Sequence, residues 1–281
     1  MRLARGFFLI VCLAIAQPQQ HLTQADVDKL MTELSNWGRW GKTDELGTVN
    51  LITPEKRRAA LRLANEGVSV SLSRNSDSRK AVDNGQPFGH KMMIGVGEHF
   101  NMDECTVAFH GFANTHFDSL SHVYYRGRMY NGFLQSSVTA TGAGHLAVTA
   151  FRDGIITRGV LIDIPRLKGA HILSHPRLSS RGSSRVGEED WGSRLVRRRR
   201  FIRTGRWARR LEKGPWDASQ HSAGLYASSA QWFKQRDVAL LGSDGSHDVI
   251  SSGISGVAGR FIKFCWSPSA CRCSTTAISR I

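Results

Sequence analysis

The first regular pattern of apolar residues predicts a helix that runs from Thr23 to about Trp37. Its apolar side chains recur at spacings of three and four residues, at Val27, Leu30, Met31 and Leu34. Thr23 and Asp26 have the spacing of a capping box, in which each side chain accepts a backbone N–H of the other residue. Gly38 follows directly and is expected to end the helix.

A second helix and a strand are expected between residues 53 and 72. Thr53, Pro54 and Glu55 supply a capping oxygen, a proline in the first turn and an acidic group against the helix dipole. The apolar residues of this helix are Ala59, Leu61, Leu63 and Ala64, and Gly67 ends it. Beyond it, apolar residues alternate with serine over 68–72, which predicts a strand with one wet face.

Three further patterns complete the expected elements. Residues 90–96 and 158–164 fit strands, and the second of these is closed by Pro165. Residues 224–241 predict a helix that leads into a strand, with an apolar helix face made of Ala227, Ala230, Trp232 and Phe233. Asp244 and His247 follow that strand. They could face a pocket, although a polar turn is the favoured interpretation.

The chemistry of the chain concentrates between residues 110 and 132. Three histidines and one aspartate lie within thirteen residues, at His110, His116, Asp118 and His122. Each histidine alone is more often a surface or core residue. Together, four such groups in a core would repel or stay unsatisfied unless something compensates them. Imidazole and carboxylate groups are the ligands of zinc or manganese, so a metal site is the first hypothesis.

The spacing of these residues favours convergence on one point. His116 and Asp118 are two residues apart, so on a strand their side chains project from the same side. His122 lies four residues beyond Asp118 and shares that face if the chain turns helical there. A strand that runs into a helix would therefore bring all three together.

Thr115, His116, Asp118 and His122 resemble the signature H-x-G-T-H-x-D-x-x-x-H of the metal-dependent cyclase family, which includes bacterial kynurenine formamidase and isatin hydrolase. Further matches look like a longer-chain branch of that family: residues 37–38, 44–50, 127–132, 158–163, 224–225, 232 and 242–244. The resemblance spans roughly residues 30 to 170 and 200 to 257. It implies an α/β fold, with one domain built on a mixed, swivelling β/β/α-type sheet core.

The resemblance also implies roles for individual residues. His116 and Asp118 would be metal ligands, and His122 would move the proton during catalysis. The first histidine of the signature falls at Phe112 and its glycine at Asn114, so His110 is the candidate to replace the missing ligand. The family draws ligands for a second metal from its C-terminal third, and no convincing match follows Val257.

Aromatic residues near the start of the chain are candidates for a substrate pocket. Trp37, Trp40 and Phe88 could line one, although aromatic side chains more often belong to the plain core. Trp37 and Phe88 are the substrate-binding residues that we carry forward.

The implied activity is hydrolysis of a small aryl formamide, of the N-formylkynurenine type, or of a cyclic amide by a water that zinc or manganese activates. A metal-binding protein of the same fold that has lost turnover is the alternative, since part of the ligand set is missing. A hydrolase with two metals is another. Members of the resembled family are commonly oligomers, so a homo-oligomer is expected as well.

Residues 1–16 are expected to form a signal peptide. Two arginines precede a short apolar run, and Ala14 and Ala16 have the spacing that signal peptidase recognises. An uncleaved anchor and a lipoprotein attached at Cys12 are less favoured alternatives. The mature protein is then expected to be secreted or periplasmic, without stable membrane association. Four cysteines remain where disulfides can persist, at Cys105, Cys265, Cys271 and Cys273.

Apolar residues make up 41% of the 281 residues, which is ordinary for a globular protein, but the formal charge of +15 is distributed unevenly. Residues 177–210 hold twelve arginines against three acidic residues, which accounts for +9 of that charge. Nucleic-acid binding is not expected, because interleaved aromatic residues are few and the protein is predicted to be exported.

The cyclase-like domain is expected to span residues 17–258, with an aberrant or disordered arginine-rich segment at 176–200 and an aberrant tail at 259–281. Translation of residues 171–200 and 259–281 outside the ancestral reading frame, or a mispredicted gene, would explain both.

Overall fold

The computed structural model describes residues 22–96, 99–169, 177–178, 199–250, 252, 254 and 271–274. The leader expected at 1–16, most of the arginine-rich segment and most of the tail lie outside the described residues. Their boundaries, and the hypothesis of a shifted reading frame, therefore stay predictions. No helix in the described part of the chain is long and apolar enough to span a membrane.

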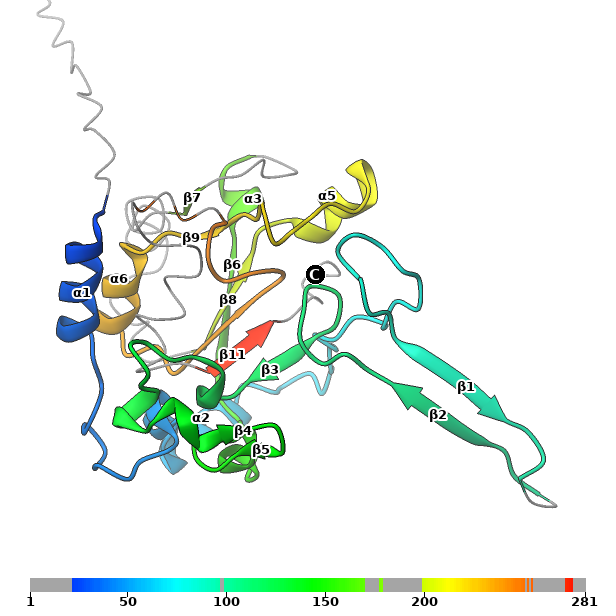
Figure 1. The fold of residues 1–281 in the computed structure, drawn as a ribbon, viewed down its shortest axis with the longest axis horizontal. Coiled ribbons are helices and arrows are strands. Elements are labelled where there is room, and N and C mark those ends of the chain that lie inside the picture. Colours follow the sequence, from blue (N-terminus) through cyan, green and yellow to red (C-terminus); the bar gives the residue numbers. More distant parts are fainter. Residues whose placement is uncertain are drawn as a thin grey trace, which may run out of the picture.

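A mixed five-stranded sheet forms the centre of the molecule (Figure 1). Its strands, in spatial order, are β3 (His116–Asp118), β11 (Cys271–Ser274), β10 (Leu240–Ser243), β8 (Arg199–Arg203) and β6 (Gly159–Asp163). The pairs β11 with β10, β10 with β8 and β8 with β6 are parallel, whereas β3 runs antiparallel to β11. The expected α/β class with a mixed sheet is confirmed.

The helix α6 (Ser229–Gln235) provides apolar cover on one face of the sheet, and the helix α1 (Gln24–Glu33) packs beside α6. The helix α6 buries Trp232 and Phe233 against Ile202 and Leu241 of the sheet, as its apolar spacing predicted. The helix α1 lies beside α6 in Figure 1, and its buried Val27 belongs to a cluster with Ala230 of α6. The capping box expected at Thr23 and Asp26 is present.

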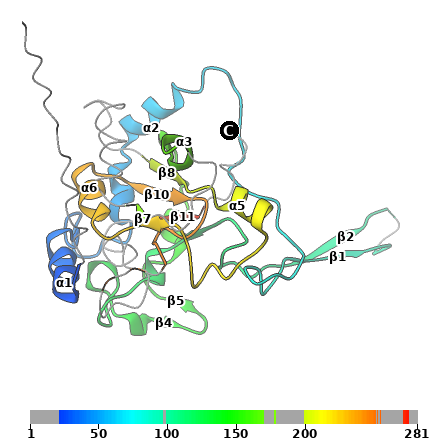
Figure 2. The same ribbon diagram turned by 90° about the horizontal axis from the view of Figure 1, so that it is seen from above.

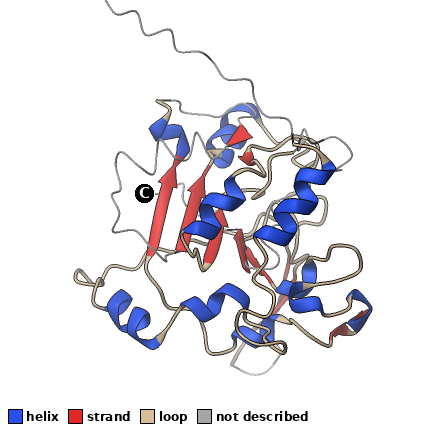
Figure 3. Cartoon of the chain, turned by 90° about the vertical axis from the view of Figure 1, so that its left-hand side faces the viewer, coloured by secondary structure: helices blue, strands red, loops and turns tan. Residues whose placement is uncertain are grey.

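The rest of the regular structure consists of short elements, and Figure 3 shows helices and loops around the strands. The helices are α2 (Pro54–Leu61), α3 (Ile164–Leu167) and α5 (Arg206–Lys213), with 3₁₀ turns η1 (Gly47–Leu51), η2 (Leu120–His122), η3 (Tyr130–Gly132), η4 (Gln135–Ser137) and η5 (Val148–Phe151). Two-stranded sheets join β4 (Val138–Thr139) to β5 (Gly142–Ala143) and β7 (Arg177–Leu178) to β9 (Gly224–Leu225). A hairpin of β1 (Gly89–Met93) and β2 (Met102–Thr106) projects from the body (Figures 1 and 2).

The second face of the sheet is covered by residues from η1. Val49, Leu51 and Ile52 form a buried cluster with Ala239 and Leu240 around β10, and Phe117 of β3 packs against this cluster. Phe117 is thus directed to one side of β3. By the alternation of a strand, its neighbours at 116 and 118 are directed to the other side.

Two predictions about residues 53–72 are wrong. The helix α2 ends at Leu61 and contains no buried residue, and Leu61 and Leu63 are more than half exposed. Residues 68–72 form no strand, and Val68 and Val70 are also exposed. Alternation gives a strand only where a neighbouring strand accepts its backbone hydrogen bonds, and no neighbour pairs with this segment among the described residues.

Candidate metal centre

The strand β3 places two of the candidate ligands on one face. His116 and Asp118 are both buried, while Phe117 between them packs into the cluster on the opposite face. The pairing with β11 fixes this orientation, since His116 lies opposite Ser274 and Asp118 opposite Arg272 in the register. The side-by-side placement expected for residues two apart on a strand is therefore confirmed.

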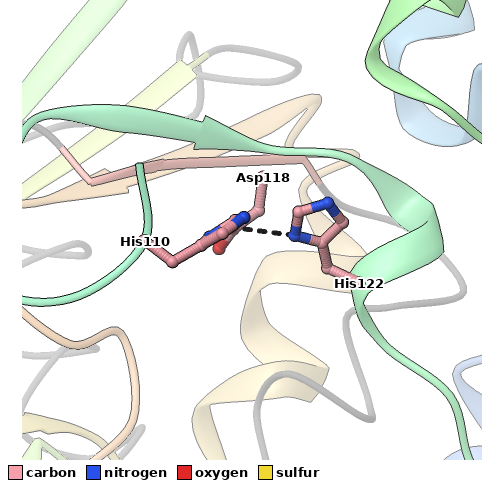
Figure 4. A group of neighbouring side chains, drawn as sticks. All are labelled: His110, Asp118 and His122. Carbon is pink, nitrogen blue, oxygen red and sulfur yellow. Dashed lines mark ion pairs between the residues drawn. The ribbon is translucent and has the colours of Figure 1, made fainter. Parts of the chain in front are cut away.

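Two more histidines lie close to Asp118, one from the segment before β3 and one from the segment after it. His122 comes from η2, the single 3₁₀ turn that follows the strand, and His110 comes from the loop that precedes it. Figure 4 shows both imidazoles directed at the Asp118 carboxylate. Asp118 Oδ1 lies 3.0 Å from His110 Nδ1, 3.6 Å from His122 Nδ1 and 3.6 Å from His116 Nε2.

His110, Asp118 and His122 form a group that could hold a metal ion, because one ligand atom from each lies within 4.8 Å of the others. His116 touches Asp118 but stands outside this group of three. The expected ligand set was His110, His116 and Asp118, with His122 as the catalytic base. The structure brings all four residues together, and how the roles divide among them stays a prediction.

The hydrogen bonds of His116 fix how its ring is used. Its Nδ1 lies 2.9 Å from the backbone carbonyl of Asn114, which can only accept, so Nδ1 carries the proton and donates it. In the neutral ring, Nε2 then presents its lone pair toward the Asp118 carboxylate. A ligating histidine typically donates its second N–H to a carbonyl in this way. A lone pair and a carboxylate that face each other suit a cation held between them.

Burial favours the neutral, metal-binding form of the His110 imidazole. Partial burial is the main influence and lowers the pKa of His110, and neighbouring His122 and His116 act in the same direction, while Asp118 opposes them. His110 is therefore neutral at pH 7, which is the state in which imidazole binds a metal. Its side chain is half exposed, so the cluster is open to solvent on this side.

The position of the missing family histidine is occupied differently. Phe112 packs against Arg206, with the guanidinium carbon 5.4 Å from the ring centre, and its backbone carbonyl accepts from Arg206 Nη2 at 3.4 Å. His110, two residues earlier, is the residue of this loop that reaches Asp118. Its proximity agrees with the idea that it replaces the missing ligand.

The two expected substrate-binding residues lie elsewhere. Trp37 is 41% exposed and packs near Gly132, and Phe88 is half-buried in the segment before β1. Neither belongs to the cluster around Asp118 in the described structure, so their role stays a prediction. Phe109, which sequence reasoning missed, lies 5.6 Å from the His110 ring and 5.7 Å from the His116 ring, between ring centres. Its position directly before His110 was the available indication.

Fold and cluster together define an α/β protein with a group of histidines and an aspartate that could hold a metal ion. The chain belongs to the cyclase family, because the family model described as "putative cyclase" matches residues 70–247. The resemblance found in the signature around Asp118 is thereby confirmed.

Solved structures agree with this family. A protein described as a novel cyclase is 26% identical and has a TM-score of 0.66, and the match covers 76% of each chain. Isatin hydrolase A from Labrenzia aggregata, solved with benzyl benzoate, is 16% identical with a TM-score of 0.51, and the match covers 78% of this chain and 84% of that one. This second likeness shows a shared fold. No curated protein sequence matches the chain.

Proposed function

We propose that the protein is a metal-dependent hydrolase of a small aryl formamide or cyclic amide. The observation that carries the proposal is the convergence of three imidazoles on one oxygen of Asp118, at 3.0 to 3.6 Å. A buried carboxylate surrounded by imidazole nitrogens is the kind of donor set that binds a divalent cation. Zinc and manganese both suit this donor set.

The four members of the cluster receive different roles. His116 and Asp118 are held rigidly by β3, and with His110 they would hold the cation. His122 is 38% exposed and sits at the open side, where a substrate can approach. It would take the proton from the attacking water and pass it to the leaving nitrogen.

The reaction breaks one C–N bond and forms one C–O bond. A divalent cation, when bound, lowers the pKa of water and polarises the substrate carbonyl. The water adds its oxygen to the carbonyl carbon, and the nitrogen leaves with the proton that His122 delivers. The products are an amine and a carboxylic acid, which is formate for a formamide or a ring-opened acid for a cyclic amide.

Two features support an aryl substrate. The fold is shared with isatin hydrolase A. Phe109 stands at the edge of the cluster with 51% of its surface exposed, so it can stack on an aromatic ring bound there.

We also propose that the protein is exported, that it is processed after residue 16, and that it acts on small molecules as a homo-oligomer.

Metal content and hydrolysis test the proposal together. Purified protein is analysed for zinc and manganese by mass spectrometry and assayed on an aryl formamide and on isatin, before and after chelation. The assignment of roles predicts that His116→Gln loses metal and activity, whereas His122→Gln keeps metal and loses at least about 100-fold in rate. His90→Gln, an exposed histidine of the β1–β2 hairpin, is the matched control and should change neither.

The outcomes separate the alternatives. Loss of metal in His122→Gln with retention in His116→Gln would assign the third ligand to His122 instead. Metal bound without hydrolysis of either substrate would favour a binding protein that has lost turnover. Absence of metal from the wild type, equal to that of Asp118→Ala, would overturn both functions.

A further inference from the structure

A second group of polar residues lies outside the cluster around Asp118, in a pocket between α5 and the segments around residues 216–223 and 245–246. Its lining residues include Arg206, Arg209, Trp216, Ser222 and Ser246. No acidic residue is among the described residues that line it. The pocket is thus rich in donors.

Arg206 is deeply buried, with 3% of its side chain exposed. Its Nη2 donates to Asp83 at 3.1 Å and to the Phe112 carbonyl at 3.4 Å. Its Nε and Nη1 are buried and have no acceptor within the described part of the chain. A buried guanidinium with two donors that lack an acceptor among the described residues is suited to an acceptor supplied by a ligand.

Arg209 repeats this feature one helical turn later. Its Nη1 is also buried without an acceptor among the residues described. Its guanidinium carbon lies 3.9 Å from the centre of the Trp216 ring, and Trp216 is itself fixed by a 2.7 Å hydrogen bond from Nε1 to the His221 carbonyl. Stacking on a fixed indole holds Arg209 at the pocket instead of leaving it to sample solvent.

The nearby carboxylates are already engaged. Asp83 is shared between Arg206 and Arg210, with Arg210 Nε at 2.8 Å. Asp244 is buried and accepts from the backbone N–H groups of Thr204, Gly205 and Arg206. Burial lowers the pKa of Arg206 to about 10, so the group is still a cation at pH 7.

We propose that this pocket binds a small carboxylate, which takes its hydrogen bonds from Arg206 and Arg209. A carboxylate is planar and accepts only, which matches guanidinium donors, and the Ser246 hydroxyl can donate to it as well. The site is separate from the cluster around Asp118, and the inference does not depend on the proposed hydrolase.

Calorimetric titration of the full chain, freed of metal on a chelating resin, tests the proposal. Benzoate and formate are the probes and distinguish a carboxylate carried on a ring from a bare one, and benzamide is the neutral control. We expect at least one carboxylate to bind and benzamide not to bind. Arg209→Gln should weaken that binding about tenfold or more, since it removes a charge-assisted donor.

Lys213→Gln is the matched variant, because it removes one positive charge from the exposed end of the same helix without touching the pocket. It should leave the affinity unchanged. Because Arg206→Gln could unfold the chain by leaving Asp83 short of a partner, its fold is checked by circular dichroism and Arg209→Gln carries the decision. Three results would overturn the proposal: equal affinity of the carboxylate for wild type and Arg209→Gln, equal losses of affinity in Arg209→Gln and Lys213→Gln, or no binding of either carboxylate to wild type. The last is judged at carboxylate concentrations up to about 10 mM, which would still detect a weak site.

Discussion

Asp44 shows how a single residue of the family motif can hold several segments of the chain together. Its carboxylate accepts from the backbone N–H of Gly47 at 2.9 Å, from Asn50 Nδ2 at 2.7 Å and from the Tyr130 hydroxyl at 2.8 Å. Asn131 adds hydrogen bonds to Gly38 and Gly41. These bonds join the segment around η1 to η3, which follows the candidate metal centre in the sequence. The motif over residues 44–50 is therefore structural.

Removal of the Tyr130 hydroxyl should show how much its hydrogen bond to Asp44 stabilises the fold. Tyr130 is 1% exposed, and its burial together with Asp44 raises the pKa of its hydroxyl, so it remains a donor at every working pH. Tyr130→Phe should lower the free energy of unfolding by about 2 kcal/mol, the usual loss for a hydrogen bond to a charged acceptor. Urea denaturation gives the value. Tyr124→Phe, at an exposed tyrosine, should change it by less than about 0.5 kcal/mol.

At the scale of elements, prediction from sequence succeeded where local and tertiary preferences agree. The helices α1 and α6 and the strands β6 and β10 carry their own apolar spacing, and α1 also carries its capping box. The segment 68–72 has the spacing of a strand without a partner. The strand β8 lies inside the sheet although its sequence, Arg-Arg-Phe-Ile-Arg, is dominated by charge. This segment forms a strand because it pairs with β10 on one side and with β6 on the other, and its own sequence does not predict this.

The capping box of α1 predicts a dependence on pH. The hydrogen bonds from Thr23 lower the pKa of Asp26 below its ordinary value. Its stabilising contribution is therefore present above the unfolded pKa and is lost as the pH falls through the lower folded pKa. Thr23→Ala should lower the free energy of unfolding by about 1 kcal/mol at pH 7. Urea titrations between pH 7 and acidic pH should show a smaller loss for Thr23→Ala than for wild type, and parallel losses would contradict this role of the box.

At the scale of the whole molecule, the candidate metal centre depends on pairings between distant parts of the chain. The strand that carries His116 and Asp118 joins the sheet through β11, which comes from residues 271–274. Those four residues belong to the tail that was expected to be aberrant, while the rest of the tail lies outside the described residues. The local signature predicted the cluster, because His116, Asp118 and His122 are near neighbours in sequence. No local pattern indicates which strand holds β3 in place.

A proline at position 273 would test whether β11 supports the metal centre. Cys273 pairs with Phe117 of β3 on one side and with Gly242 of β10 on the other, so its strand is internal. Proline has no backbone N–H and cannot complete the ladder of an internal strand, so Cys273→Pro should lower the free energy of unfolding by about 1 to 3 kcal/mol in urea denaturation, because a carbonyl of the neighbouring strand loses its donor. It should also weaken zinc binding, since β3 orients His116 and Asp118. Cys273→Ser keeps the N–H and should retain both properties. Equal stability and zinc affinity in the two variants would mean that β3 holds its ligands without β11.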